Sequence, residues 1–293
     1  MDLYLVRYIN GPSFAYFVMG ESLKLKEELN VAKDLAVLAG NKIVEIYNSE
    51  DCSVDYRENN GPLTKADLES NRIIVEGLRK NFPDFGILTE EGAKSLDRLS
   101  KEFVWIVDPL DGTKEFIARN GEFTVNIALV YNGNPVLGVV YLPVQDILFF
   151  SSKEEGAFCQ RGNELTKLHV SDRFDINEMV LIKSRNHSSE REKTLINHYK
   201  FKKVESAGSC LKGGLIAKGD VDIYFRFGDV NEWDICAMDA ILRGAGGDLT
   251  NLDGVRLKYN GEDFLVRGGF LASNGNIHNY LLALEEMMKD GSA

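Results

Sequence analysis

Two carboxylates, Asp108 and Asp111, stand three residues apart directly after an apolar run, and they carry the strongest chemical signal in the chain. A carboxylate at the end of a buried strand costs free energy unless something compensates its charge. Hard divalent cations such as Mg²⁺ take oxygen ligands of this kind, and one carboxylate can bridge two ions about 3.5–4 Å apart. Thr113 adds a hydroxyl beside the pair, and Glu90-Glu91 lies upstream. The pattern predicts a divalent-cation site.

A turn explains part of the same pattern, because Asp-Pro and Asp-Gly are common turn-forming pairs. Pro109 fixes one φ angle and lacks an N–H donor, so the strand is expected to stop there. Gly112 lets the chain turn sharply. Either acid alone would be explained as a turn residue. Both together, beside Thr113 and the upstream acidic pair, favour the cation site.

Hydrophobic periodicity predicts the elements that position these acids. Runs of apolar, β-branched and aromatic residues predict a buried strand at 103–107 and a shorter one at 87–89, which ends at Glu90. Apolar residues at helical spacing predict a helix over 22–47. Thr64 has the pattern of an N-cap with Asp67 at position N3, so capping alone would explain Asp67.

The rest of the chain divides into two halves. Residues 21–158 are expected to form helices on an antiparallel sheet that carries the acidic motif, with Asn132-Gly133 as a hairpin turn. Residues 159–293 alternate strands with helices, which is typical of an α/β half. No linker separates the halves, so we expect them to pack as one unit. Residues 1–20 are interpreted as an N-terminal extension.

Composition excludes several classes of function. The chain of 293 residues has a net charge of −11 and a pI of about 5.0, which argues against nonspecific binding to nucleic acid or anionic membranes. No apolar span of bilayer length and no basic leader are present. The cysteines lack paired spacing, which fits a reducing cytoplasm. We expect a cytoplasmic protein, as a monomer or homodimer.

The motif around Asp108 and Asp111 resembles that of a known family. The run Asp108-Pro109-Leu110-Asp111-Gly112-Thr113, followed by Phe116, matches the metal-binding signature of the inositol monophosphatase superfamily of Mg²⁺-dependent, lithium-sensitive phosphatases. Its continuation to Val130 looks like the 3'(2'),5'-bisphosphate nucleotidase branch, CysQ type, although Ala118 departs slightly from the signature. The resemblance covers about residue 22 to the C-terminus. It implies the layered αβαβα sandwich, of α+β and α/β character, of the sugar phosphatases.

The resemblance also implies a set of metal ligands. Trp233-Asp234 is similar to the second signature of the superfamily, whose Asp binds a metal, although Met238 replaces the small residue that is usual there. By itself, Asp234 would be explained as a helix N-cap. The family motifs imply two or three Mg²⁺ ions held by Glu90, Asp108, Asp111, Asp234 and the Leu110 carbonyl. Glu90, Thr113 and Asp67 would then act on the attacking water, with Thr113 paired to Glu90.

Substrate-binding residues are expected mainly in the second half. Where inositol phosphatases carry an acid, this chain has Arg226, and Lys212 falls in a segment similar to the G-S-x-x-K of the nucleotidases. Arg and Lys are suited to holding a second, non-reacting phosphate. Each could instead be an ordinary solvated residue, and His187 an ordinary loop histidine. The full expected set comprises Gly112, Thr113, Ser184, His187, Ser209, Lys212, Arg226 and Asp234.

These features favour hydrolysis of a small phosphorylated nucleotide. The reaction expected from the resemblance converts adenosine 3',5'-bisphosphate to AMP and phosphate with Mg²⁺. The alternatives are an inositol monophosphatase or sugar bisphosphatase of the same superfamily, and a catalytically silent nucleotide-binding protein. Arg226 speaks against a plain inositol monophosphatase.

Overall fold

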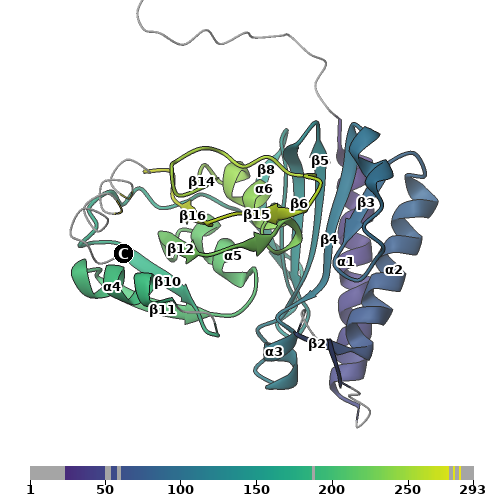
Figure 1. The fold of residues 1–293 in the computed structure, drawn as a ribbon, viewed down its shortest axis with the longest axis horizontal. Coiled ribbons are helices and arrows are strands. Elements are labelled where there is room, and N and C mark those ends of the chain that lie inside the picture. The colour runs from purple at the N-terminus through teal and green to yellow at the C-terminus, as the bar shows by residue number, and fades with distance from the viewer. Residues whose placement is uncertain are drawn as a thin grey trace, which may run out of the picture.

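The computed structural model describes residues 24–49, 54–57, 61–186 and 189–276, together with Tyr280 and Leu284. The predicted extension at 1–20 lies outside the described residues. The chain forms alternating layers of helix, sheet, helix, sheet and helix (Figure 1). This arrangement is the layered sandwich expected from the sequence.

Two antiparallel helices, α1 (Lys26–Tyr47) and α2 (Lys65–Asn81), cover the outer face of the larger sheet (Figure 1). The buried side of α1 includes Ala32, Ala36 and Ala39, whose small side chains allow close approach to the sheet. The Thr64 side chain accepts hydrogen bonds from the N–H groups of Ala66 and Asp67, and Asp67 accepts one from the Thr64 N–H at 2.8 Å. The predicted capping box is therefore confirmed.

The larger sheet has seven strands in sequential order, β3 to β9. They are β3 (Gly86–Thr89), β4 (Phe103–Asp111), β5 (Thr124–Tyr131), β6 (Asn134–Leu142), β7 (Ile147–Ser152), β8 (Gly156–Arg161) and β9 (Glu164–Lys167). All neighbours are antiparallel except β3 and β4, which are parallel. The boundary expected at residue 158 falls inside β8, because β8 pairs with β9 and the sheet continues to Lys167.

Strand β4 does not stop before Pro109, as the sequence suggested, but continues to Asp111. Its pairing with β5 is regular from Phe103 to Asp108 and then shifts, so that Asp111 is opposite Thr124. Proline is tolerated in a strand at such an irregularity because no ladder hydrogen bond is required of it. The irregularity therefore lets the strand carry both aspartates of the motif.

The smaller sheet has the order β11-β10-β12-β16-β14. Its strands are β10 (Val180–Ser184), β11 (Lys203–Ala207), β12 (Ile223–Phe227), β14 (Asp248–Thr250) and β16 (Gly269–Ser273). Helices α5 (Leu211–Ala217) and α6 (Cys236–Gly244) lie between the two sheets, and α4 (Glu190–His198) packs against β12 from the other side (Figure 1). The second half has the strand–helix alternation that the sequence predicts.

Short elements complete the described chain. They are the pair β1 (Val54–Arg57) and β2 (Gly61–Thr64), the pair β13 (Val230–Asn231) and β15 (Leu265–Val266), α3 (Thr113–Ile117), and the 3₁₀ turns η1 (Leu96–Ser100) and η2 (Glu232–Asp234).

One of the apolar clusters of the core joins the inner face of β4, at Val104 and Ile106, to Tyr224 and Cys236 from the second half. None of the helices in the described ranges is long and apolar enough to cross a membrane.

Candidate active site

A cavity of about 380 Å³ is bordered by residues of both halves. One part of its wall comes from the end of β4 and the start of α3, including Asp111 and Thr113. The facing part comes from α5, β12 and the turn before α6. The predicted site residues that border it are Glu90, Asp111, Gly112, Thr113, Ser184, Ser209, Lys212, Arg226 and Asp234. His187 lies outside the described residues.

The two aspartates of β4 are fixed by hydrogen bonds from the main chain. Asp108 is 2% exposed, and its Oδ1 accepts from the Leu110 N–H at 3.1 Å. Asp111 Oδ2 accepts from the Cys210 N–H at 2.7 Å and from Asn126 Nδ2 at 3.3 Å. The bond to Cys210 crosses from the first half of the chain to the second. Asp111 is therefore held at the junction of the two halves.

Gly112 makes the turn that follows β4 possible. Its φ is +94°, in the left-handed region, and a Cβ atom there would lie 3.3 Å from Glu115 Oε2 and 3.4 Å from the Glu122 carbonyl oxygen. Glycine is the residue that adopts this conformation without steric cost. The turn brings Thr113 to the cavity directly after Asp111.

Glu90 reaches the aspartates because β3 and β4 are parallel. Thr89 is in register with Val107, and the Glu90 N–H donates to the Val107 carbonyl at 3.2 Å. Parallel strands end at the same edge of a sheet, so the residues that follow them are neighbours. The sequence predicted the strand and the acid, but not the parallel pairing that joins them.

Asp234 is not the N-cap of α6, as capping statistics would suggest. It is the third residue of η2, and its Oδ2 accepts from the Asn231 N–H at 3.3 Å, while α6 begins at Cys236. This short turn places Asp234 on the wall of the cavity with Asn231 and Ile235.

Burial and mutual repulsion raise the pKa values of these acids. Burial, followed by the charge of Asp234, raises the pKa of Glu90 to about 8. Burial and then Asp111 raise the pKa of Asp234 to about 7. Burial and then Glu90 hold the pKa of Asp108 well above its ordinary range. Burial also raises the pKa of Asp111, which the charge of Lys212 opposes.

The donor set has the chemistry that a hard cation requires. Glu90, Asp108, Asp111 and Asp234 offer carboxylate oxygens at one place, and their mutual repulsion favours binding of positive charge. Across the ranges that the structure covers, however, no three acid, histidine or cysteine side chains already converge as a ready-made ion cage. Small movements of the carboxylates would be part of cation binding.

Thr113 is paired with Asp67 and not with Glu90, in contrast to the expectation. Thr113 Oγ1 donates to Asp67 Oδ1 at 3.4 Å. Asp67 is 2% exposed, and burial raises its pKa to about 6, although hydrogen bonds from Thr64 act in the other direction. The two roles considered for Asp67 are therefore compatible: Oδ2 caps α2, and Oδ1 meets Thr113.

Lys212 is a buried residue and not a solvated helix side chain. It is 6% exposed, its Nζ donates to the Ser209 carbonyl at 2.6 Å, and it lies 5.0 Å from the centre of the Tyr224 ring. Burial lowers its pKa, and the charge of Asp111 opposes that shift. Lys212 therefore brings positive charge close to Asp111.

Two further polar groups at the cavity have unused hydrogen-bonding capacity. Arg226 Nε and Ser209 Oγ are both buried and have no hydrogen-bond partner among the described residues. Buried polar groups are normally hydrogen-bonded, so contacts within the described chain do not account for these two unpaired atoms. Ser184, at the end of β10, is 8% exposed and borders the same cavity.

Sequence reasoning missed several residues of the wall. Glu115, Met238 and Phe270 all border the cavity. Met238 belongs to the same family signature as Asp234, so its place in that motif could have signalled it. Phe270 reaches the cavity because it is in register with Arg226 across β12 and β16, which local sequence does not reveal.

The comparisons with known proteins match almost the whole described chain. The model of the inositol monophosphatase family matches residues 24–288. The chain is 37% identical over 243 residues to the 3'(2'),5'-bisphosphate nucleotidase CysQ of Buchnera aphidicola, covering 82% of this chain and 91% of that one. It is 36% identical over 241 residues to CysQ of Escherichia coli K12, with coverage of 82% and 96%.

Solved structures agree with the sequence relatives. The crystal structure of CysQ from Bacteroides thetaiotaomicron superposes with a TM-score of 0.75 at 36% identity, covering 86% of this chain and 98% of that one. An IMPase of Thermotoga maritima superposes with a TM-score of 0.76 at 26% identity, with coverage of 90% and 99%.

Proposed function

The chain belongs to the inositol monophosphatase family, and within that family we propose that it is a Mg²⁺-dependent 3'(2'),5'-bisphosphate nucleotidase. Its reaction is the hydrolysis of adenosine 3',5'-bisphosphate to AMP and inorganic phosphate. Water attacks the 3'-phosphorus, the bond from phosphorus to the ribose 3'-oxygen breaks, and that oxygen takes up a proton. The relatives named as nucleotidases support this substrate, because the chain covers nearly all of their length.

The group of four acids at the cavity end of β3, β4 and η2 is the proposed metal site. Glu90, Asp108, Asp111 and Asp234, with the Leu110 carbonyl, would hold two or three Mg²⁺ ions. When bound, Mg²⁺ polarises the phosphoryl group, activates water and stabilises the leaving oxygen. Each acid must be ionised to act as a ligand, so their raised pKa values imply that binding strengthens as the pH rises.

Thr113 and Asp67 are proposed to act on the attacking water. The Thr113 hydroxyl donates its proton to Asp67 Oδ1, so its oxygen lone pairs are free to accept a hydrogen bond from water. This bond orients the water. The pKa of Asp67, about 6, allows its carboxylate to be ionised at neutral pH and to share the proton that the water loses.

Two basic side chains, Arg226 and Lys212, are proposed to determine substrate specificity. Arg226 and Lys212, which we call the basic wall, border the same cavity as Glu90, Asp111 and Asp234. A bisphosphate has one phosphate for the metal side and a second for the basic side, and arginine binds phosphate through two parallel bonds. Ser184, Ser209 and Gly112 would contact the ligand between these two sides. The presence of a group of acids and of two basic side chains around one cavity is the observation that carries the proposal.

A comparison of substrates tests the proposal. Phosphate release with Mg²⁺ is measured for adenosine 3',5'-bisphosphate, inositol 1-phosphate and fructose 1,6-bisphosphate at equal concentration. The expected result is a kcat/KM for the nucleotide at least about tenfold above that for inositol 1-phosphate, the discrimination that one charged contact supplies, and also above that for fructose 1,6-bisphosphate. A preference for inositol 1-phosphate or the sugar would refute the nucleotide assignment. Absence of release from all three would refute the enzymatic proposal.

A further inference from the structure

The carboxylate of Glu122 connects the two halves of the chain. Glu122 lies between α3 and β5, in the first half. Its Oε2 accepts from the Gly208 N–H at 2.8 Å and from Arg185 Nε at 3.0 Å, and its Oε1 accepts from Arg185 Nη2 at 2.6 Å. Arg185 and Gly208 both belong to the second half, directly after β10 and β11. One side chain therefore holds two segments of the facing half.

Gly208 begins a turn that both walls of the cavity share. Its N–H is bound by Glu122, and two residues later the Cys210 N–H is bound by Asp111 at 2.7 Å. The carbonyl of the intervening Ser209 accepts from Lys212 Nζ at 2.6 Å. The turn 208–210 thus touches an acid of the metal motif on one side and the buried lysine on the other.

The conformation of this turn is strained and close-packed. Ser209 has a φ of +45°, in the left-handed region that non-glycine residues rarely adopt. A Cβ atom at Gly208 would lie 2.7 Å from Glu115 Cγ and 2.8 Å from the Glu122 carbonyl oxygen. Strained residues persist where surrounding contacts determine them. The bond from Glu122 to the Gly208 N–H is one of these contacts.

A second contact runs beside the first. Asn186 Nδ2 donates to Glu115 Oε1 at 2.6 Å, so consecutive residues after β10 bind two acids of the segment that follows Asp111. Arg185 Nη2 also donates to the Ser206 carbonyl at 3.3 Å, which connects the ends of β10 and β11. The acids of one half and the donors of the other form a continuous seam that includes the turn 208–210.

We propose that Glu122 is a positioning residue for substrate binding: by holding Gly208 and Arg185, it sets the place of Ser209 and Lys212 relative to Asp111. The inference rests on the proposed function. Glu122 does not border the cavity, so it acts through the turn and not on the substrate. Loss of the Glu122 carboxylate should displace Ser209 and Lys212, so we expect substrate binding to weaken more than turnover slows.

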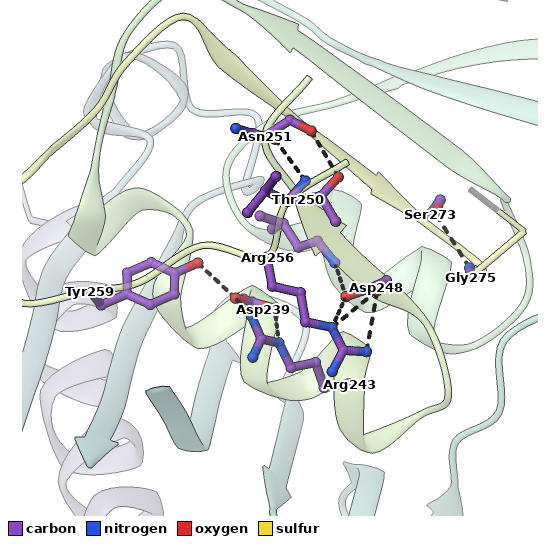
Figure 2. Close-up of polar contacts among 11 residues, drawn as sticks. Asp239, Arg243, Asp248, Thr250, Asn251, Arg256, Tyr259, Ser273 and Gly275 are labelled. Atoms are coloured by element: carbon purple, nitrogen blue, oxygen red, sulfur yellow. Dashed lines mark hydrogen bonds and ion pairs between the residues drawn. The ribbon is translucent and has the colours of Figure 1, made fainter. Parts of the chain in front are cut away.

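The chain offers a matched control for a purely structural role. Asp248 also binds one arginine through both its oxygens, at 3.1 and 3.2 Å from Arg256 Nε, and it accepts from a main-chain N–H, that of Leu249, at 3.1 Å (Figure 2). The Asp248 side chain is 19% exposed and that of Glu122 is 21% exposed. Neither Asp248 nor Arg256 borders the active-site cavity.

The test compares Glu122→Ala, Glu122→Gln and Asp248→Ala in the full chain. The KM for adenosine 3',5'-bisphosphate is expected to rise about tenfold in Glu122→Ala, the loss expected for a charge-assisted hydrogen bond, while kcat changes less. Glu122→Gln keeps an acceptor for the Gly208 N–H and should recover part of the loss. Asp248→Ala should leave KM unchanged. Amide hydrogen exchange at Gly208 and Cys210 should accelerate in Glu122→Ala and not in Asp248→Ala.

The outcomes separate this inference from the proposed function. If wild-type protein prefers the nucleotide but Glu122→Ala keeps its KM and its amide protection at 208–210, the positioning role is wrong. An equal rise of KM in Asp248→Ala would also overturn it, because the effect would then be a general loss of stability. If wild-type protein releases no phosphate, the proposed function fails, and exchange at Gly208 and Cys210 still decides whether Glu122 holds the turn.

Discussion

Two sites with buried acids differ in the source of the positive charge that balances the acids. Asp239, on α6, is fully buried, and both its oxygens accept from Arg243, from Nε and from Nη2, each at 2.7 Å (Figure 2). The Tyr259 hydroxyl donates to the same carboxylate at 2.9 Å. Around the cavity, by contrast, the largest charge interaction of Glu90, of Asp108 and of Asp234 is in each case with another acid.

The pKa shifts record the same difference. Burial raises the pKa of Asp239 to about 6, and the charge of Arg243 limits the rise. At Glu90, burial raises the pKa to about 8, and the neighbouring acids add to the rise. A buried acid whose partner is supplied by the chain stabilises one structure, whereas a group of acids without such partners is suited to an external cation. Substitutions in the two groups should therefore have opposite consequences.

The largest effect is expected from Asp111→Asn. The change removes a proposed metal ligand, and kcat/KM should fall by about a thousandfold or more. The free energy of unfolding should change little, because the loss of repulsion with Asp234 offsets the loss of attraction to Lys212. Steady-state phosphate release and urea denaturation measure the two quantities. Near-full turnover in this variant would rule out the metal assignment.

Asp239→Asn should show the reverse pattern. It leaves Arg243, whose side chain is 19% exposed, beside a neutral neighbour, and weakening its charged hydrogen bonds should lower the unfolding free energy by about 1.5–3 kcal/mol. The kcat/KM of the folded fraction should remain at the wild-type value, since Asp239 does not border the cavity. Urea denaturation and phosphate release at low temperature check both points. A large loss of kcat/KM with unchanged stability would contradict the contrast between the two groups.

The metal-free protein should lose stability as the pH rises from about 5 to about 8. Glu90 and Asp234 have pKa values of about 8 and about 7 in the folded chain, above their ordinary 4.5 and 3.8, so the folded state binds more protons in this window. Linkage then makes the slope negative, by up to about 1.4 kcal/mol per pH unit for each proton.

Mg²⁺ should oppose this loss by binding the ionised acids. At a hundred times its Kd it adds about 2.7 kcal/mol to the unfolding free energy. Thermal unfolding with EDTA and with Mg²⁺ across this pH range measures both effects. Glu90→Gln serves as the control and should flatten the slope. A metal-free stability that rises with pH would contradict the electrostatics described for the cavity.

The smallest of these effects concerns the basic wall. Arg226→Glu should raise the KM for adenosine 3',5'-bisphosphate by about tenfold or more, because it removes a phosphate contact and adds a like charge. Adenosine 3'-monophosphate lacks the second phosphate and should be affected less. Initial rates on both substrates give the comparison. Equal losses on the two would remove the second-phosphate role of Arg226.

Local sequence was sufficient to predict the helix cap, the hairpin turn and the buried strand, because each depends on neighbouring residues. The capping box of Thr64 and Asp67, the hairpin at Asn132-Gly133 and the strand before Asp108 follow from neighbouring residues. The family resemblance added Asp234, the one expected metal ligand of the second half, and the layered fold. Local patterns and family motifs alike are contiguous in the chain.

The features that local sequence could not supply depend on contacts between distant segments. The partner of Thr113 is Asp67 and not Glu90, because α2 and the turn after β4 meet in space. Pro109 does not end β4, because an irregular register with β5 accommodates it. Glu115 and Phe270 join the cavity only through packing of one half on the other. Such facts follow from pairing and layering, which no local pattern records.

The most direct test of the account is the rate of phosphate release from adenosine 3',5'-bisphosphate as a function of Mg²⁺ concentration. Wild-type protein, Asp111→Asn and Asp239→Asn are compared, with EDTA as the zero point. The account predicts no release with EDTA, a saturable rise with Mg²⁺ in the wild type and in Asp239→Asn, and almost none in Asp111→Asn. Equal release with EDTA, or a wild-type protein inactive at every Mg²⁺ concentration, would contradict it.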